Sequence, residues 1–172
     1  RHAIALSLPV VAVAAATVEL VSRALAGCRM TDGAYDPTVL GDVIRAGYDR
    51  SFDDLVDLAH APASDLHRDA AGIAVDRGAN AVRVPTGVGF DPGGVGKGLA
   101  ADLVADQISA EGAAGVLVNI GGDLRAVGYG PGGDDWTVDV DPADTGLPLA
   151  RVALHQGGLA TSTVLRRRWR VG

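Results

Sequence analysis

A glycine-rich turn with one lysine is the part of this sequence best suited to bind phosphate. Residues 90–101, FDPGGVGKGLAA, contain four glycines and Lys97 and run into residues with helical spacing. A helix N-terminus presents unpaired N–H groups and a positive dipole end to anions, and glycines let a ligand approach the backbone closely. Asp91 can hold the turn by accepting hydrogen bonds from nearby amides. The segment therefore predicts a site for a nucleotide-like ligand, or alternatively a helix start whose glycines only permit tight packing on a sheet.

The same segment departs from the phosphate-binding loop of the P-loop NTPases. That motif requires a glycine five residues before its Gly-Lys pair, where this sequence has Asp91, and a Ser or Thr after the lysine, where it has Gly98. Without that hydroxyl one magnesium ligand is missing. The dinucleotide fingerprint G-x-G-x-x-G is also absent, so neither common phosphate motif explains the turn.

A second segment with ligand-binding potential is TDGAYDPT, residues 31–38. It places the Tyr35 ring between Ala34 and Asp36, in a turn restricted by a proline. The ring can form one wall of a pocket, and Asp36 can accept hydrogen bonds from the ring or hydroxyl groups of a ligand. The alternative is a simple turn.

A third segment is NIGGDLR, residues 119–125, in which two glycines precede Asp123. A backbone without side chains allows a flat or phosphate-bearing ligand to lie against it, and Asp123 can contact a ribose hydroxyl. Equally, the glycines can form a β-bulge and Asp123 can cap the next turn.

The elements that must position these segments follow from hydrophobic periodicity. Residues 3–26 predict a short strand and an amphipathic helix, and Pro9, Glu19 and Arg23 argue against a signal peptide or membrane span. A short helix over residues 38–44, a β-hairpin over 71–90 and a helix over 98–111 are expected next. On the last helix, one apolar side is predicted from these residues: Leu99, Leu103, Val104 and Ile108.

The C-terminal third predicts strands over residues 115–130, 136–141 and 150–163, joined by tight Gly and Pro turns into an antiparallel meander behind the helix. This pattern suits an α+β or an α/β fold. The basic run of Arg166, Arg167, Arg168 and Arg170 is expected to be a solvated strand edge, with docking of an acidic partner as the alternative.

Composition narrows the class of protein further. The 172 residues are 48% hydrophobic and 21% charged, which is enough for one domain with a substantial core. A net charge of -6 argues against nucleic-acid binding, which depends on many Lys and Arg contacts to phosphates. Cys28 is the single cysteine, which excludes an internal disulfide.

Taken together, the segments resemble the ApbE family of magnesium-dependent enzymes that cleave FAD and attach FMN to a target protein. TDGAYDPTV, FDPGGVGKGLAAD, VNIGGDLRAVG and LATST look like four motifs of the family, in the family's order and with similar spacing. The resemblance implies a layered, T-fold-like α+β fold with an antiparallel sheet and packed helices. It covers residues 1–172 as one flavin transferase domain that is incomplete at both ends.

The resemblance also implies roles for individual residues. Ala34, Tyr35 and Asp36 would contact FAD, as would Gly93 and Leu99 around the glycine turn. The backbone carbonyl of Gly96 would be one Mg²⁺ ligand. Lys97 and Asp123 are the candidate catalytic residues, with Lys97 offsetting phosphate charge.

The implied reaction is attack by a threonine hydroxyl of an acceptor protein on the FMN-side phosphorus of FAD, with release of AMP. Hydrolysis of FAD to FMN and AMP, or a non-catalytic flavin-binding remnant, stay open as alternatives. The sequence ends before the family's H-x-I-D-P-x-T-G segment and before the remaining magnesium ligands, which a cation needing about six oxygens requires. Many relatives are exported lipoproteins. The resemblance is therefore compatible with an extracytoplasmic or membrane-anchored location, and equally with a cytoplasmic one.

Overall fold

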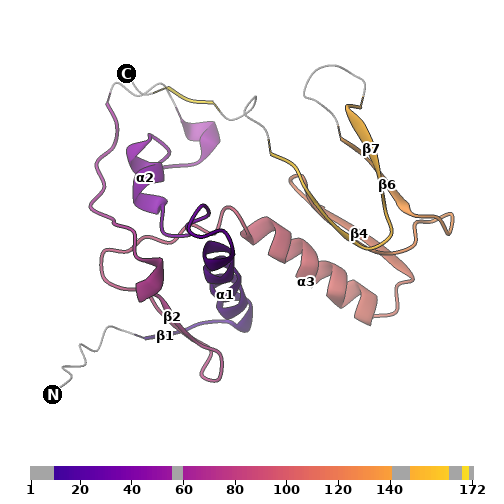
Figure 1. Ribbon diagram of the computed structural model, residues 1–172, viewed down its shortest axis with the longest axis horizontal. Coiled ribbons are helices and arrows are strands. Elements are labelled where there is room, and N and C mark those ends of the chain that lie inside the picture. Colours follow the sequence, from indigo (N-terminus) through magenta and orange to yellow (C-terminus); the bar gives the residue numbers. More distant parts are fainter. Residues whose placement is uncertain (1–9, 56–59, 141–147, 163–167, 171–172) are drawn as a thin grey trace. The chain divides into compact units, whose positions relative to one another are not determined.

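The computed structural model describes residues 10–55, 60–140, 148–162 and 168–170 (Figure 1). The chain divides into two compact units. Unit 1 comprises Arg1–Val95 and Trp169–Gly172, and unit 2 comprises Gly96–Arg168. Each unit combines helix with antiparallel sheet, which confirms the α+β class.

Unit 1 packs one long helix against a small sheet. Strands β1 (Val11–Ala12), β2 (Ala74–Asp76) and β3 (Ala81–Arg83) pair antiparallel in the order β1-β3-β2. Helix α1 (Ala15–Met30) packs on β2 and β3. The unit also contains the short helix α2 (Leu40–Arg45) and single 3₁₀ turns at Phe52–Asp54 and Ala70–Gly72. The predicted strand, two helices and hairpin are thus confirmed.

The periodicity of α1 determines which of its faces is buried. Val18, Val21 and Leu25 recur at helical spacing and join the core formed with Ile73, Val82 and Val88. On the solvent side, Glu19 accepts hydrogen bonds from Arg23 and Arg77. Among the described residues, no helix is long and apolar enough to cross a membrane.

Unit 2 packs one helix against a three-stranded sheet. Helix α3 (Gly96–Ala110) lies against β4 (Gly115–Ile120) and β5 (Asp123–Gly128), and β8 (Gly157–Ala160) pairs with the other edge of β5 (Figure 1). β6 (Trp136–Val140) and β7 (Ala150–Leu154) form a separate antiparallel pair. The predicted helix is confirmed, and it ends where Gly112 adopts a φ of 98°.

The predicted three-strand meander is wrong in two respects, of which the first is that residues 115–130 form two paired strands, β4 and β5. The last predicted strand is two strands, β7 and β8, which belong to different sheets because the chain bends at His155 and Gln156. The chain after β5 therefore makes the β6–β7 hairpin before it returns beside β5. Sequence alternation does not reveal this change of partner, because both strands alternate in the same way.

The apolar side predicted for α3 also differs from the buried one. Leu99 is buried, but Leu103, Val104 and Ile108 remain 38–43% exposed. The fully buried positions are Ala101 and Ala105 on α3 and Ala126 on β5. The buried positions are thus largely small residues, which a count of large apolar residues overlooks. Of the basic run, Arg166 and Arg167 lie outside the described residues, and residues 168–170 form no strand.

Candidate functional site

The TDGAYDPT segment is a turn at the C-terminal end of α1 that its own side chains hold. The Thr31 hydroxyl donates to the Gly27 carbonyl at 2.9 Å and accepts from the Tyr35 amide at 3.0 Å. Asp32 and Gly33 have φ angles of 50° and 79°, which reverse the chain after the helix. Sequence reasoning assigned no role to Thr31, although a threonine at the end of a helix is a known source of side-chain to backbone bonds.

The two carboxylate oxygens of Asp36 are used differently. Oδ1 accepts hydrogen bonds from the Thr38 amide at 2.8 Å and from the Thr38 hydroxyl at 2.6 Å. Thr38 is 1% exposed, so these bonds satisfy buried polar groups. Oδ2 lies 3.8 Å from Nη1 of Arg68. Only Oδ2 is therefore available to a ligand, and Oδ1 maintains the turn.

The beginning of the glycine turn contacts the TDGAYDPT segment within unit 1. The Asp91 amide donates to the Pro37 carbonyl at 2.7 Å, and the Asp91 carboxylate accepts from the Gly93 amide at 2.7 Å. The predicted role of Asp91 in holding the turn is thereby confirmed. Two of the segments that were singled out separately in the sequence are joined by a backbone hydrogen bond.

The Tyr35 ring packs between Gly94 of the glycine turn and Gly27 of α1. A Cβ built on Gly94 would lie 2.6 Å from the Tyr35 ring, and one on Gly27 would lie 3.2 Å from it. Among the described residues the buried Tyr35 hydroxyl has no hydrogen-bond partner. Burial, followed by the nearby charge of Asp91, raises the pKa of the Tyr35 phenol. The phenol is thus a neutral group at physiological pH with an unused hydrogen-bonding capacity.

The glycines of the turn are present for different reasons. Gly94 is required by packing, because a side chain there would collide with the Tyr35 ring. At Gly98, in the first turn of α3, an added Cβ would meet no atom within 4 Å, and its φ lies outside the left-handed region. Glycine inside a helix costs about 1 kcal/mol relative to alanine. Tight packing therefore explains Gly94 but not Gly98, where the open space is compatible with close approach of a ligand.

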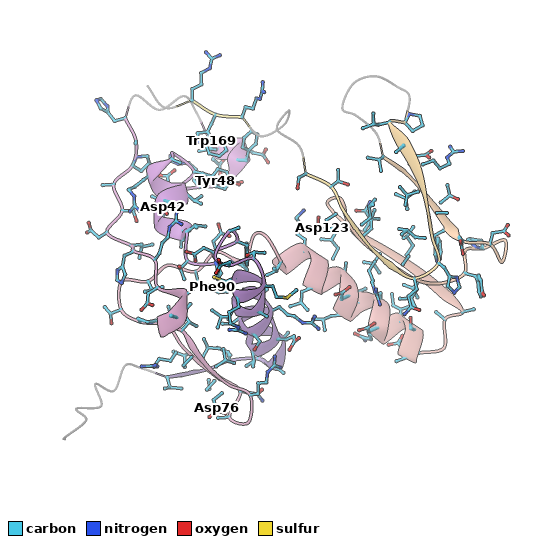
Figure 2. All side chains as sticks on the ribbon, viewed as in Figure 1. Asp42, Tyr48, Asp76, Phe90, Asp123 and Trp169 are labelled. Carbon is cyan, nitrogen blue, oxygen red and sulfur yellow. The ribbon has the colours of Figure 1, made fainter. Side chains whose placement is uncertain are left out.

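Unit 2 brings together the two candidate catalytic residues. Nζ of Lys97 lies 3.4 Å from Oδ2 of Asp123 and donates to the Gly121 carbonyl at 3.2 Å. Asp123 is labelled in Figure 2. The Lys97 side chain is 47% exposed and that of Asp123 is 17% exposed. The lysine of the glycine-rich turn and the carboxylate of the NIGGDLR segment thus meet at the N-terminal end of α3.

The loop between β4 and β5 creates this meeting point. Ile120 pairs with Asp123, so Gly121 and Gly122 form a two-residue hairpin loop with φ angles of 59° and 94°. Positive φ at both positions is the property of a type I′ turn, so the β-bulge interpretation is wrong. Oδ1 of Asn119 accepts from the Gly122 amide at 2.9 Å. Sequence reasoning gave Asn119 no role, although Asn before a glycine turn favours such a bond.

The remaining predicted site residues have more limited roles in the structure. Ala34 is exposed in the turn after α1, and Gly93 is exposed beside Asp91. The Leu99 side chain is buried, so any ligand contact from this residue would come from its backbone. Gly96 is the first residue of α3. The described residues contain no cluster of three His, Cys, Asp or Glu side chains that could hold a metal. The Gly96 carbonyl would supply one of the about six oxygens that Mg²⁺ requires.

A pocket of about 370 Å³ adjoins the turn within unit 1. Its walls come from α2, from the loop after it and from the start of the glycine turn, and they include Leu40, Val43, Ile44, Tyr48, Phe90 and Pro92. Trp169 packs on Tyr48 with ring centroids 5.2 Å apart and donates to the Ala46 carbonyl at 2.6 Å (Figure 2). Sequence patterns did not indicate this pocket, because its walls combine residues 40–50 with residues 90–92, which are far apart in the chain.

Solved structures of ApbE proteins have a fold similar to that of this chain. The ApbE protein of Thermotoga maritima superposes with a TM-score of 0.73 at 27% identity, covering 90% of this chain and 51% of its own. The flavinyl transferase ApbE of Pseudomonas stutzeri gives 0.67 at 22% identity, covering 90% and 48%, respectively. A mutant of the flavin transferase ApbE of Vibrio cholerae gives 0.69 at 22% identity, covering 91% and 52%.

The chain thus spans about half the length of these solved structures. A search of curated proteins found no match. The sequence model of the ApbE family matches residues 3–172, nearly the whole chain. The fold and the family match lead to the same conclusion: this chain belongs to the ApbE family.

Proposed function

We propose that this chain is a flavin transferase that attaches FMN, through a phosphoester, to a threonine of an acceptor protein. The threonine oxygen bonds to the FMN-side phosphorus of FAD, the bond from that phosphorus to the bridging oxygen breaks, and AMP departs. The hydroxyl proton passes to solvent. Such phosphoryl transfers depend mainly on positioning and on neutralisation of charge.

The observation that carries this proposal is the contact of Lys97 with Asp123 at the start of α3. The ammonium lies where the helix dipole is positive, so that this end of unit 2 favours phosphate oxygens. In the transfer, Lys97 offsets negative charge on the pyrophosphate, and Asp123 orients the ammonium. The open space at Gly98 supports a phosphate approaching the first turn of α3.

The FAD contacts proposed for unit 1 involve the turn after α1. Oδ2 of Asp36 and the hydroxyl of Tyr35 are polar atoms with hydrogen-bonding capacity left, and Ala34 offers exposed backbone. Gly93 contributes exposed backbone as well. These groups support recognition of the ring and hydroxyl groups of a nucleotide. They do not favour its phosphates, because the nearby carboxylates of Asp36 and Asp91 would repel phosphate.

Mg²⁺ belongs to this proposal through the family resemblance, with the Gly96 carbonyl as one ligand. Bound magnesium would neutralise pyrophosphate charge. The described side chains do not complete its coordination, so the roles assigned to Lys97 and Asp123 do not depend on it.

The test is incubation of the full chain with FAD, Mg²⁺ and an acceptor domain that carries a target threonine. We expect a fluorescent acceptor band on a denaturing gel, together with AMP in solution. An acceptor in which alanine replaces the threonine is the matched substrate control. Arg77→Gln is the matched enzyme control, since Arg77 pairs with Glu19 on the solvent side of α1.

Two results would contradict transfer. Release of AMP without a fluorescent band would show hydrolysis of FAD. Retained FAD binding without AMP would show a binding module that has no catalytic activity.

A further inference from the structure

Arg68, which lies outside all four sequence motifs, is the charged side chain beside the free oxygen of Asp36. Its Nη1 lies 3.8 Å from Oδ2 of Asp36. That distance is too long for a hydrogen bond but close enough for charge attraction. Oδ2 therefore faces a positive charge and still has acceptor capacity for a ligand.

Arg68 is itself held by α2. Its Nε and Nη2 both contact Oδ2 of Asp42, which is labelled on α2 in Figure 2. The other oxygen of Asp42 pairs with Arg45, which also donates to the carbonyls of Ser64 and Leu66. These contacts restrain the Arg68 guanidinium although its side chain is 55% exposed.

Arg68 is the cation that lies between the carboxylates of Asp36 and Asp42. The charges that act on the neighbouring Tyr35 phenol come from Asp91, Cys28 and Asp36 itself. Asp42 pairs with two cations, Arg68 and Arg45. The remaining contacts of the Asp36 carboxylate, with Thr38, are uncharged. Of the arginines in this cluster, Arg68 is the one that lies within 4 Å of the Asp36 carboxylate, at 3.8 Å.

We infer that Arg68 is a positioning residue for nucleotide binding: it holds the Asp36 carboxylate so that Oδ2 accepts a hydrogen bond from a ring N–H or hydroxyl of the ligand. This inference rests on the proposed function, because it takes FAD as that ligand. Arg68 acts through Asp36 and is not assigned a contact with the reacting phosphorus.

The test is a double-mutant cycle measured by FAD titration of the full chain, with thermal unfolding of each variant as a parallel measurement. Arg68→Gln removes the charge, and Arg68→Lys keeps it. Asp36→Asn keeps an oxygen for Thr38 but replaces the free carboxylate oxygen with an NH₂ group. Arg45→Gln is the matched control, because it removes the other arginine of Asp42 and leaves the charge beside Asp36.

Arg68→Gln should weaken FAD binding by about threefold to fivefold, the upper part of the range expected for a partly exposed charge contact. Arg68→Lys should retain most of the affinity, and Arg45→Gln should change it by less than about twofold even where unfolding is affected. In the Asp36→Asn background, Arg68→Gln should have no further effect on FAD affinity. A purely structural role would lower the unfolding temperature without this dependence on Asp36.

Equal FAD affinity of Arg68→Gln and the parent would overturn the inference and leave the proposed function intact. An effect of Arg68→Gln that persists in the Asp36→Asn background would overturn it as well. A parent chain that fails to bind FAD would contradict both the proposed function and the inference.

Discussion

Gly94 and Gly98 are four residues apart in one motif, yet their surroundings differ completely. A side chain at Gly94 would collide with the Tyr35 ring, whereas a Cβ at Gly98 would meet none of the described atoms within 4 Å. Gly94 belongs to unit 1 and Gly98 to unit 2. The comparison shows that one glycine-rich motif combines a packing requirement in its first half with open space in its second half.

The candidate acidic residues of the two units, Asp36 and Asp123, also differ in how far they are committed to the fold. Asp36 in unit 1 uses one oxygen to satisfy buried Thr38, while Asp123 in unit 2 pairs with a half-exposed lysine. A change at Asp36 is therefore expected to affect stability and binding together. A change at Lys97 is expected to affect chemistry with little effect on the fold.

The largest effect is expected for Lys97→Met. Loss of a cation that stabilises transferring phosphate should lower FMN transfer by about 100-fold or more. The free energy of unfolding should change by less than about 0.5 kcal/mol, because the side chain is half-exposed. Gel fluorescence and thermal unfolding check the two halves of this prediction, and an active Lys97→Met variant would remove the lysine from the site.

The next effect is that of Asp36→Ala, which should destabilise unit 1 by about 2 kcal/mol because the buried amide and hydroxyl of Thr38 lose their acceptor. Asp36→Asn retains that acceptor and should unfold close to the parent. Both variants should bind FAD more weakly in titrations. Parent-like affinity in the well-folded Asp36→Asn variant would show that Asp36 is a structural residue only.

Gly98→Ala should have opposite effects on stability and function. Removal of a helical glycine in open space should stabilise α3 by up to about 1 kcal/mol. The added methyl group should weaken FAD binding if the ligand approaches this position. Denaturant unfolding and FAD titration of one preparation test both, and a stabilised variant with unchanged affinity would assign the open space to solvent.

The smallest effect concerns the pH dependence that Tyr35 contributes. Its pKa is raised in the folded chain, so the unfolded phenol ionises first, near pH 10. Stability should therefore be unaffected by Tyr35 below about pH 10 and should decrease as the pH rises towards the folded pKa. Denaturant midpoints at about pH 9 and about pH 11 should show a steeper decrease in the parent than in Tyr35→Phe. Equal decreases would mean that the phenol is accessible to solvent.

Much of the local structure followed from the sequence. Helical spacing identified α1 and α3, alternation identified β6, and the turn residues between β2 and β3 identified a hairpin. The four motifs also indicated the family. These features are encoded within short windows, where backbone geometry and hydrophobic periodicity act directly on neighbouring residues.

Long-range relations could not be obtained in this way. The division of residues 150–163 between two sheets, the exposure of Leu103 and the contact of Arg68 with Asp36 all depend on partners distant in the chain. Pairing partners and burial are set by the total packing of a unit, to which a local pattern contributes only part of the free energy.

By itself, the sequence determined the α+β class, the family and the segments that bear polar and glycine residues. Only the tertiary structure decided what each of those residues does: Asp36 divides its oxygens between Thr38 and free acceptor capacity, and Lys97 reaches Asp123 across the β4–β5 turn. The physical reason is that a side chain's type limits the bonds it can make, whereas the atoms that packing brings within about 3 Å decide which bonds it makes.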